Sequence, residues 1–287
     1  MSIGVEPFFD EQTFTVTYVV SDPVRKICAV IDPILDFDQA SGRTSHESAD
    51  KVVGFIKQNG FKLNLILETH AHADHLSGGP YIKSKLGGKI AIGEHIVDVQ
   101  RIFKEVFNLE KSFNIQGQQF EVLFKDGDTF TIGDLQGRVM HTPGHTPACL
   151  TYVIEDAAFV GDTLFQPDYG SARADFPGGD ARALFRSMRK ILSLPDDTRI
   201  FTCHDYLAEG RDHFEWESTV RQQRENNIHV HDGVDEDEFV AMRTARDKTL
   251  GMPQLILPSV QVNIRAGALP PPDDNGISYL KLPINAL

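Results

Sequence analysis

The sequence contains Thr69-His70-Ala71-His72-Ala73-Asp74-His75, and this stretch decides the fold because it places four potential metal ligands close together. It directly follows the apolar run Leu63-Asn64-Leu65-Ile66-Leu67. A short apolar run that ends in a polar cluster is typical of a buried strand with ligands on the loop at its carboxyl end. Open α/β proteins place their chemistry at that end. Imidazoles and a carboxylate without a thiolate suit a hard or borderline divalent metal.

The composition limits the classes of protein that the chain can belong to. With 287 residues, of which 41% are hydrophobic, it can form one large domain or two ordinary ones. The formal net charge of −13 argues against a nucleic-acid partner, because phosphate binding requires clustered Lys and Arg. The three cysteines are widely spaced, which fits a reduced, cytoplasmic protein. We find no signal-peptide pattern and no apolar stretch near the roughly 20 residues of a membrane span, so we expect no membrane contact.

Hydrophobic periodicity and turn residues predict an alternation of strands and helices. Strands are expected at 13–20, 26–32, 63–67, 89–92, 120–124, 129–132, 135–140, 150–154, 157–160 and 199–202. Helices are expected from Ser45 or Ser48 to 57, and at 80–86, 94–107, 180–193 and 214–227. This order favours two mixed sheets that pack together with helices outside. The tail after His229 is expected to pack over the surface or against a partner.

Three later motifs add further candidate ligands. His145 lies in the turn-rich loop 141–147, Asp162 lies in Gly161-Asp162-Thr163, and His204 precedes Asp205-Tyr206. Each of these residues follows the end of a predicted strand. If these strands run in the same direction, their carboxyl ends bring the ligands to one edge, as a metal site requires.

In order along residues 69–206, the motifs His-x-His-x-Asp-His, Pro-Gly-His, Gly-Asp-Thr and His-Asp-Tyr resemble those of the metallo-β-lactamase superfamily. The resemblance implies an α/β fold, the αβ/βα sandwich, in which two mixed β-sheets are flanked by helices. It also implies a metal site at one edge between the sheets. We expect residues 1–230 to form the catalytic domain and residues 231–287 to form a C-terminal extension packed on the same domain.

A more local resemblance points to one branch of this superfamily. Residues 170–179, which include Arg173, resemble the Gly-x-x-Arg-x-Asp-Phe segment of the persulfide dioxygenases. The His-Asp-Tyr motif also fits that group, whereas glyoxalase II commonly has Glu in the middle position. The resemblance implies oxidation of glutathione persulfide by O2 to sulfite and glutathione. It implies one Fe(2+) per chain, held by His70, His145 and Asp162.

Under that resemblance, His72, Asp74, His75 and His204 surround the iron ligands without binding the metal. A facial set of two histidines and one carboxylate leaves positions open on iron, which supports the same assignment on physical grounds. The alternative is a dinuclear Zn(2+) hydrolase of acyl-glutathione thioesters, similar to glyoxalase II. In that case a first zinc would bind His70, His72 and His145. A second zinc would bind Asp74, His75 and His204, and Asp162 would bridge the two zinc ions. Counting ligands does not separate the two.

The substrate contacts are less well defined by the sequence. Arg173 is a candidate for binding a glutathione carboxylate, and its alternative is a structural pair with Asp175. Tyr206 is a candidate hydrogen-bond donor to substrate. Family members use a further Arg or Lys from the late helical region, but here residues 226–229 read Asn-Asn-Ile-His. Three cations are candidate replacements, namely Arg243, Arg246 and Lys248. The oligomeric state is open, and a homodimer is one option.

Overall fold

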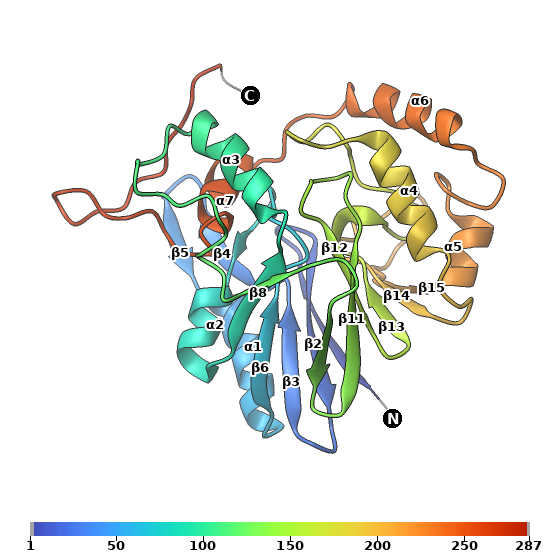
Figure 1. Ribbon diagram of the computed structural model, residues 1–287, viewed down its shortest axis with the longest axis horizontal. Coiled ribbons are helices and arrows are strands. Elements are labelled where there is room, and N and C mark those ends of the chain that lie inside the picture. The colour runs from blue at the N-terminus through green and yellow to red at the C-terminus, as the bar shows by residue number, and fades with distance from the viewer. Residues whose placement is uncertain (1–2, 286–287) are drawn as a thin grey trace.

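The computed structural model describes residues 3–285 and arranges them as two large packed β-sheets with helices on both outer faces, together with a small three-stranded sheet (Figure 1). The strands are β1 (Gly4–Asp10), β2 (Thr15–Asp22), β3 (Ile27–Ile31), β4 (Ile34–Asp38), β5 (Arg43–Ser45), β6 (Lys62–Leu67), β7 (Leu76–Ser77), β8 (Lys89–Gly93), β9 (Val122–Phe124), β10 (Thr129–Ile132), β11 (Leu135–His141), β12 (Leu150–Ile154), β13 (Ala157–Phe159), β14 (Arg199–Phe201) and β15 (Glu217–Thr219). The helices are α1 (Glu47–Gln58), α2 (Gly79–Leu86), α3 (Ile96–Val106), α4 (Ala181–Ile191), α5 (Val220–Asn226), α6 (Glu236–Asp247) and α7 (Ile256–Asn263), together with the short 3₁₀ turn η1 (Gly161–Thr163).

The two large sheets enclose one core layer, and each has a second layer under its helices. One sheet has the order β1-β2-β3-β6-β8-β9 and the other the order β10-β11-β12-β13-β14-β15. In β2, Val16, Tyr18 and Val20 pack between the sheets, whereas Val19 joins the cluster beneath the helices α1, α2, α3 and α7. This alternation is the period of two that a strand imposes. Helices α4, α5 and α6 cover the other sheet. The predicted αβ/βα sandwich is therefore confirmed.

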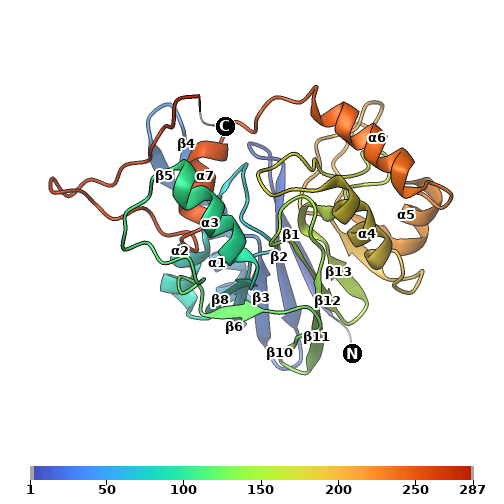
Figure 2. The ribbon, with the colours of Figure 1, turned by 45° about the horizontal axis from the view of Figure 1, so that its top comes forward.

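Strand direction brings the ends of several strands to one edge (Figure 2). Strands β3, β6 and β8 are parallel neighbours. In the other sheet β13 and β14 are parallel, and β11 runs in the same direction because it and β13 both pair antiparallel with β12. The sheets meet at this edge, where the Val16 N–H donates to the Cys203 carbonyl at 2.7 Å. The loops after β6, β11, β13 and β14 therefore converge, as the motif order predicts.

The prediction and the structure differ most near the C-terminal part of the chain. The helix predicted over 214–227 is wrong in its first part, because Glu217–Thr219 form β15 and pair with β14. Thr219 then caps α5 in a capping box with Gln222. Strands β1, β4, β5 and β7 and helix α7 were not predicted. Among residues 3–285, none of the helices combines the length and apolar character needed to cross a bilayer.

Candidate metal centre

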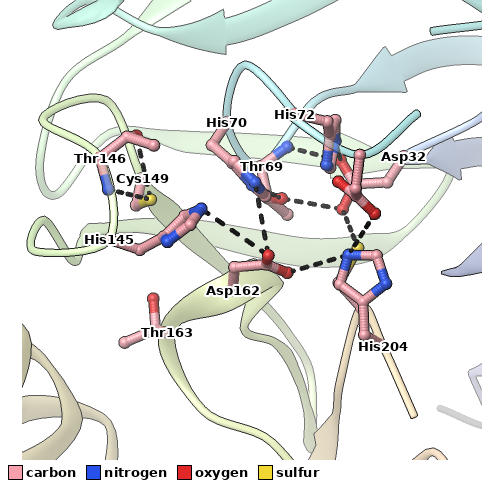
Figure 3. Close-up of polar contacts among 12 residues, drawn as sticks. Asp32, Thr69, His70, His72, His145, Thr146, Cys149, Asp162, Thr163 and His204 are labelled. Carbon is pink, nitrogen blue, oxygen red and sulfur yellow. Dashed lines mark hydrogen bonds and ion pairs between the residues drawn. The ribbon is translucent and has the colours of Figure 1, made fainter. Parts of the chain in front are cut away.

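Three of the candidate ligands come together where the two sheets meet (Figure 3). His70, His145 and Asp162 each offer one ligand atom, and these atoms all lie within 4.8 Å of one another. Asp162 Oδ2 lies 3.8 Å from His70 Nε2 and 3.7 Å from His145 Nε2. All three side chains are buried. Two imidazoles and one carboxylate in this arrangement form a donor set of the kind that first-row divalent metals bind.

Buried atoms without a hydrogen-bond partner mark the same place. Within residues 3–285 they include His70 Nε2, His72 Nδ1, His75 Nε2, Asp162 Oδ1 and His204 Nε2. Buried polar atoms in folded proteins are nearly always paired. Five unpaired atoms at one site therefore indicate that a bound partner normally contacts them. A cation would satisfy nitrogen and oxygen acceptors together. The residues present therefore fit a bound metal ion.

The far nitrogens of two imidazoles are held by backbone carbonyl groups. His145 Nδ1 lies 2.9 Å from the carbonyl oxygen of Arg173, and His204 Nδ1 lies 3.1 Å from that of Phe14. An N–H donated to a carbonyl leaves the other ring nitrogen without a proton, which is the form that binds a metal. Backbone carbonyls therefore occupy the ring nitrogens of His145 and His204 that lie away from Asp162.

Asp32, which directly follows β3, organises the start of the histidine motif. It accepts the Thr69 N–H at 2.7 Å and the Thr69 hydroxyl at 2.8 Å, and that hydroxyl lies 3.0 Å from His70 Nδ1. Burial and the neighbouring imidazoles lower the pKa of His70 well below 6.5, so its ring stays neutral. His72 Nε2 lies 3.0 Å from Asp32 Oδ1. Although burial lowers the pKa of His72, the carboxylates of Asp32 and Glu68 outweigh it and raise that pKa well above 6.5.

A close approach of two loops sets the position of Asp162. The preceding residue, Gly161, has φ +52°, and a Cβ added there would lie 2.6 Å from the Thr69 hydroxyl oxygen. Glycine is therefore required for the loop after β13 to approach the loop after β6. This contact explains why the Gly-Asp-Thr motif begins with glycine.

The ligands of the dinuclear alternative also lie nearby. His204 Nε2 lies 3.1 Å from Asp74 Oδ2 and 3.3 Å from Asp162 Oδ1. His72, Asp74 and His75 form a further set with ligand atoms within 4.8 Å. A second cation would therefore find donors here. The positions of the side chains are compatible with one metal or with two.

A pocket of about 380 Å³ is lined by the candidate ligands His145 and Asp162, and its size is within the roughly 300–1,000 Å³ of small-molecule sites. Tyr169 and Tyr206 form an aromatic wall with ring centroids 5.3 Å apart, and Tyr206 also stacks on His204. Burial raises the pKa of Tyr206 well above 10. Its hydroxyl therefore remains a hydrogen-bond donor beside the metal centre.

Three arginines line this pocket, and two of them are neutralised by neighbouring acids. Arg173 Nε lies 2.5 Å from Asp175 Oδ1, and its Nη2 lies 2.7 Å from Oδ2. Arg243 Nη2 lies 2.6 Å from Asp247 Oδ1. Arg246 is exposed and forms no ion pair with any residue between 3 and 285. Its guanidinium carbon lies 6.0 Å from the centre of the Tyr169 ring. Arg246 is therefore the cation of this pocket that remains available to an anion.

The other candidates for substrate contact lie in different surroundings. Arg173 also donates to the Gly251 carbonyl at 2.7 Å, so its guanidinium is held on both sides. Lys248 lines a separate hollow and is not among the residues of the metal pocket. His229 is buried and accepts the Ser171 N–H at 3.0 Å. Of the three replacement cations considered from the sequence, Arg246 is the exposed one at this pocket.

Comparison with known proteins decides the family. Residues 12–204 match the family model described as the metallo-beta-lactamase superfamily. The chain belongs to the metallo-β-lactamase superfamily. It is 54% identical, over 99% of both chains, to a protein from Burkholderia pseudomallei named a metallo-hydrolase. It is 51% identical to glyoxylase B2 of Dictyostelium discoideum, over 99% of this chain and 97% of that one. It spans 65% of the length of a beta-lactamase hydrolase-like protein of Xylella fastidiosa, at 54% identity.

Similarity within the superfamily also extends to the persulfide dioxygenases. The chain is 30% identical to the mitochondrial persulfide dioxygenase ETHE1 of Homo sapiens, over 94% of this chain and 91% of that one. The crystal structure of ETHE1 from Myxococcus xanthus superposes with a TM-score of 0.72 and 25% identity, covering 92% of this chain and all of that one. The predicted resemblance to both the superfamily and this branch is confirmed.

Sequence reasoning missed several residues that support the superfamily site. Asp32 directly follows the apolar strand β3, and Asp162 follows the apolar run 157–160 closely, so this shared pattern is the signal that identifies Asp32. Glu68 immediately precedes the histidine motif and accepts the Ser77 hydroxyl at 2.5 Å. Tyr169 has no distinguishing motif. Asn263 lies far along the chain, and only the fold brings it to the metal-binding loop.

Proposed function

We propose that this chain is a glutathione-dependent persulfide dioxygenase with a single non-haem iron at His70, His145 and Asp162. The reaction converts glutathione persulfide, O2 and water into glutathione and sulfite. The terminal sulfur is oxidised, O2 is reduced, and the S–S bond breaks so that the inner sulfur leaves as the thiol. Iron(II) would supply the capacity to bind O2 and a persulfide sulfur at the same centre.

The observation that carries this proposal is the composition of the ligand set that contains His145 and Asp162. His70, His145 and Asp162 group within 4.8 Å, and His72 is not part of that group. A mononuclear zinc site of the hydrolase type would need His72 as its third imidazole. In the structure His72 directs Nε2 toward Asp32 and Glu68, so Nδ1, which has no hydrogen-bond partner, is the ring nitrogen left for a second or alternative metal. The chain is similar in sequence to human ETHE1, at 30% identity, and similar in structure to ETHE1 from Myxococcus xanthus. Both similarities support the dioxygenase.

The chain's own residues account for substrate binding and orientation. A glutathione carboxylate would pair with Arg246, the pocket cation without an acidic partner. The Tyr206 hydroxyl would donate to the bound substrate beside the metal, because its raised pKa keeps the proton in place. Aromatic side chains on one wall exclude water from the reacting sulfur. We assign Arg173 mainly to holding its own loop, since Asp175 and the Gly251 carbonyl occupy its donors.

The second candidate is a dinuclear zinc hydrolase of acyl-glutathione thioesters. It is favoured by the unpaired His75 Nε2 and His204 Nε2, which would suit a second metal. The names of the metallo-hydrolase and glyoxylase relatives point the same way. In that reaction Asp162 would bridge the two metals.

Metal analysis of protein expressed without added metal tests the proposal. We expect about one iron per chain and little zinc. Two zinc ions per chain, with hydrolysis of a lactoyl-glutathione thioester, would support the hydrolase and reject the dioxygenase. Reconstitution with each metal under anaerobic conditions controls for the metal supply during expression.

A further inference from the structure

One buried amide from the C-terminal helix α7 holds the backbone of the metal-binding loop. Asn263 Nδ2 donates to the carbonyl oxygens of His72 and His75, at 2.8 Å each. Asn263 Oδ1 accepts the Ser77 N–H at 2.8 Å. This network fixes the orientation of the amide, because a flipped side chain would place its oxygen against two carbonyls. The side chain is 4% exposed, so water does not replace these contacts.

Close contacts with neighbouring segments fix the position of the end of α7. Gln100 of α3 donates to the Ile264 carbonyl at 2.9 Å. Gly267 has φ +84°, and a Cβ there would lie 2.9 Å from the Ser77 carbonyl oxygen and 2.6 Å from Pro80 Cδ. A residue larger than glycine would push the helix end away from the loop. The position of Asn263 is therefore fixed on both sides.

The two bonds hold the backbone of the loop that carries the candidate ligand His70. His72 and His75 bracket Asp74, and the loop from His70 to His75 contains no regular secondary structure of its own. His72 and His75 are buried, so their backbone carbonyls need partners. A single side chain that pairs two of them restricts the loop to one conformation. Without it, the two carbonyls are unpaired and the loop can rearrange.

We infer that Asn263 is a positioning residue of the metal centre, which holds the histidine motif in its metal-binding conformation. The inference requires a metal at the site but does not depend on which metal or which reaction. It assigns a role in the metal site to a segment that lies outside the residues matched by the family model, 12–204.

Titration of chelated protein with Co(II), followed by visible absorption, tests this inference. Loss of supporting hydrogen bonds around a metal ligand typically weakens metal binding by about 10- to 100-fold. We therefore expect Asn263→Ala to raise the Kd for Co(II) by about that factor and to change the absorption bands. Asn263→Asp should do the same, because it keeps an acceptor for Ser77 but loses both donors. Asn263→Asp allows the same titration if Asn263→Ala does not fold.

The same helix offers a matched control. Gln261 is also a buried amide, and it bonds to the Leu257 carbonyl at 2.7 Å and the Lys281 carbonyl at 2.9 Å, away from the metal. Gln261→Ala should lower the melting temperature but keep the wild-type Kd and spectrum. Wild-type Co(II) affinity and spectrum in both Asn263 variants would overturn the inference, even if the melting temperature falls. Absence of metal binding in the wild type would instead reject the proposed function.

Discussion

His145 Nδ1 lies 2.9 Å from the carbonyl oxygen of Arg173, so one hydrogen bond joins a candidate metal ligand to the loop that borders the substrate pocket. Helix α6 holds the same loop. Asp247 Oδ2 accepts the Ala174 N–H at 3.0 Å, and Arg243 donates to the Ser171 carbonyl at 3.2 Å. The metal centre, the pocket loop and α6 therefore form one connected structure.

Replacement of Asp162 by asparagine should nearly abolish turnover and leave the fold intact. Asparagine keeps the size of the side chain but removes the anionic ligand, so the metal is held less tightly. Metal content and oxygen uptake would be measured together, with circular dichroism as the check on folding. Near-normal iron and turnover in Asp162→Asn would show that the ligand assignment is wrong.

Arg246→Ala should raise KM for glutathione persulfide more than it lowers kcat. A charge-assisted hydrogen bond to a carboxylate contributes about 1.5 to 3 kcal/mol. Because Arg246 is exposed, we expect the lower end, which corresponds to a rise in KM of about tenfold. Lys248→Ala is the control, since it removes the same charge from an exposed position close by but outside the pocket. If the two variants raised KM equally, Arg246 would act through the overall charge of this surface and not through a direct contact with the substrate.

The pair of Arg173 and Asp175 should behave as a structural unit. Side-chain exposures of 15% and 39% place it partly in solvent, so we expect a coupling free energy of about 0.5 to 1 kcal/mol in a double-mutant cycle of unfolding. Arg173→Ala and Asp175→Ala should each shift KM by a similar, small factor. If Arg173→Ala alone raised KM by more than about tenfold, Arg173 would bind the substrate directly.

Stability should depend on pH through His229. Burial, together with the charges of Arg243 and Arg246, lowers the pKa of His229 from 6.5 to about 4. Between these values the unfolded chain binds more protons, so the free energy of unfolding falls as the pH drops through this window. His229→Gln should reduce the loss of stability between pH 7 and pH 5, measured by urea unfolding of the chelated protein. His231→Gln, at an exposed position, is the control, and an identical pH dependence in wild type and His229→Gln would refute the assignment.

The fold and a set of candidate ligands could be predicted from the sequence because both depend on local patterns. Asp162 and His204 follow short apolar runs, and the parallel pairing of β13 with β14 brings the ends of these strands to one edge. The predicted helix 180–193 begins at Asp180, which caps α4 by accepting the Ala183 N–H at 2.7 Å. Such signals are contained within a few residues, so they can be read without tertiary structure.

Other features depend on contacts between distant segments. The segment 217–219 follows the helical pattern of its neighbours but becomes β15 because β14 offers it a partner. Helix α7 contains Pro258 and is buried on nearly all sides, including its polar residues Gln261 and Asn263, so it lacks an amphipathic period. Asn263 bonds to residues that lie 191 and 188 positions earlier in the chain. No spacing rule identifies a residue of this kind.

Oxygen uptake on addition of glutathione persulfide to the anaerobically iron-loaded protein tests the central claim most directly. We predict that the oxygen concentration falls immediately and that sulfite appears in equal amount. The zinc-loaded protein and Asp162→Asn should consume no oxygen. Iron-loaded protein that consumes no oxygen with this substrate, while the zinc-loaded protein cleaves an acyl-glutathione thioester, would contradict the account.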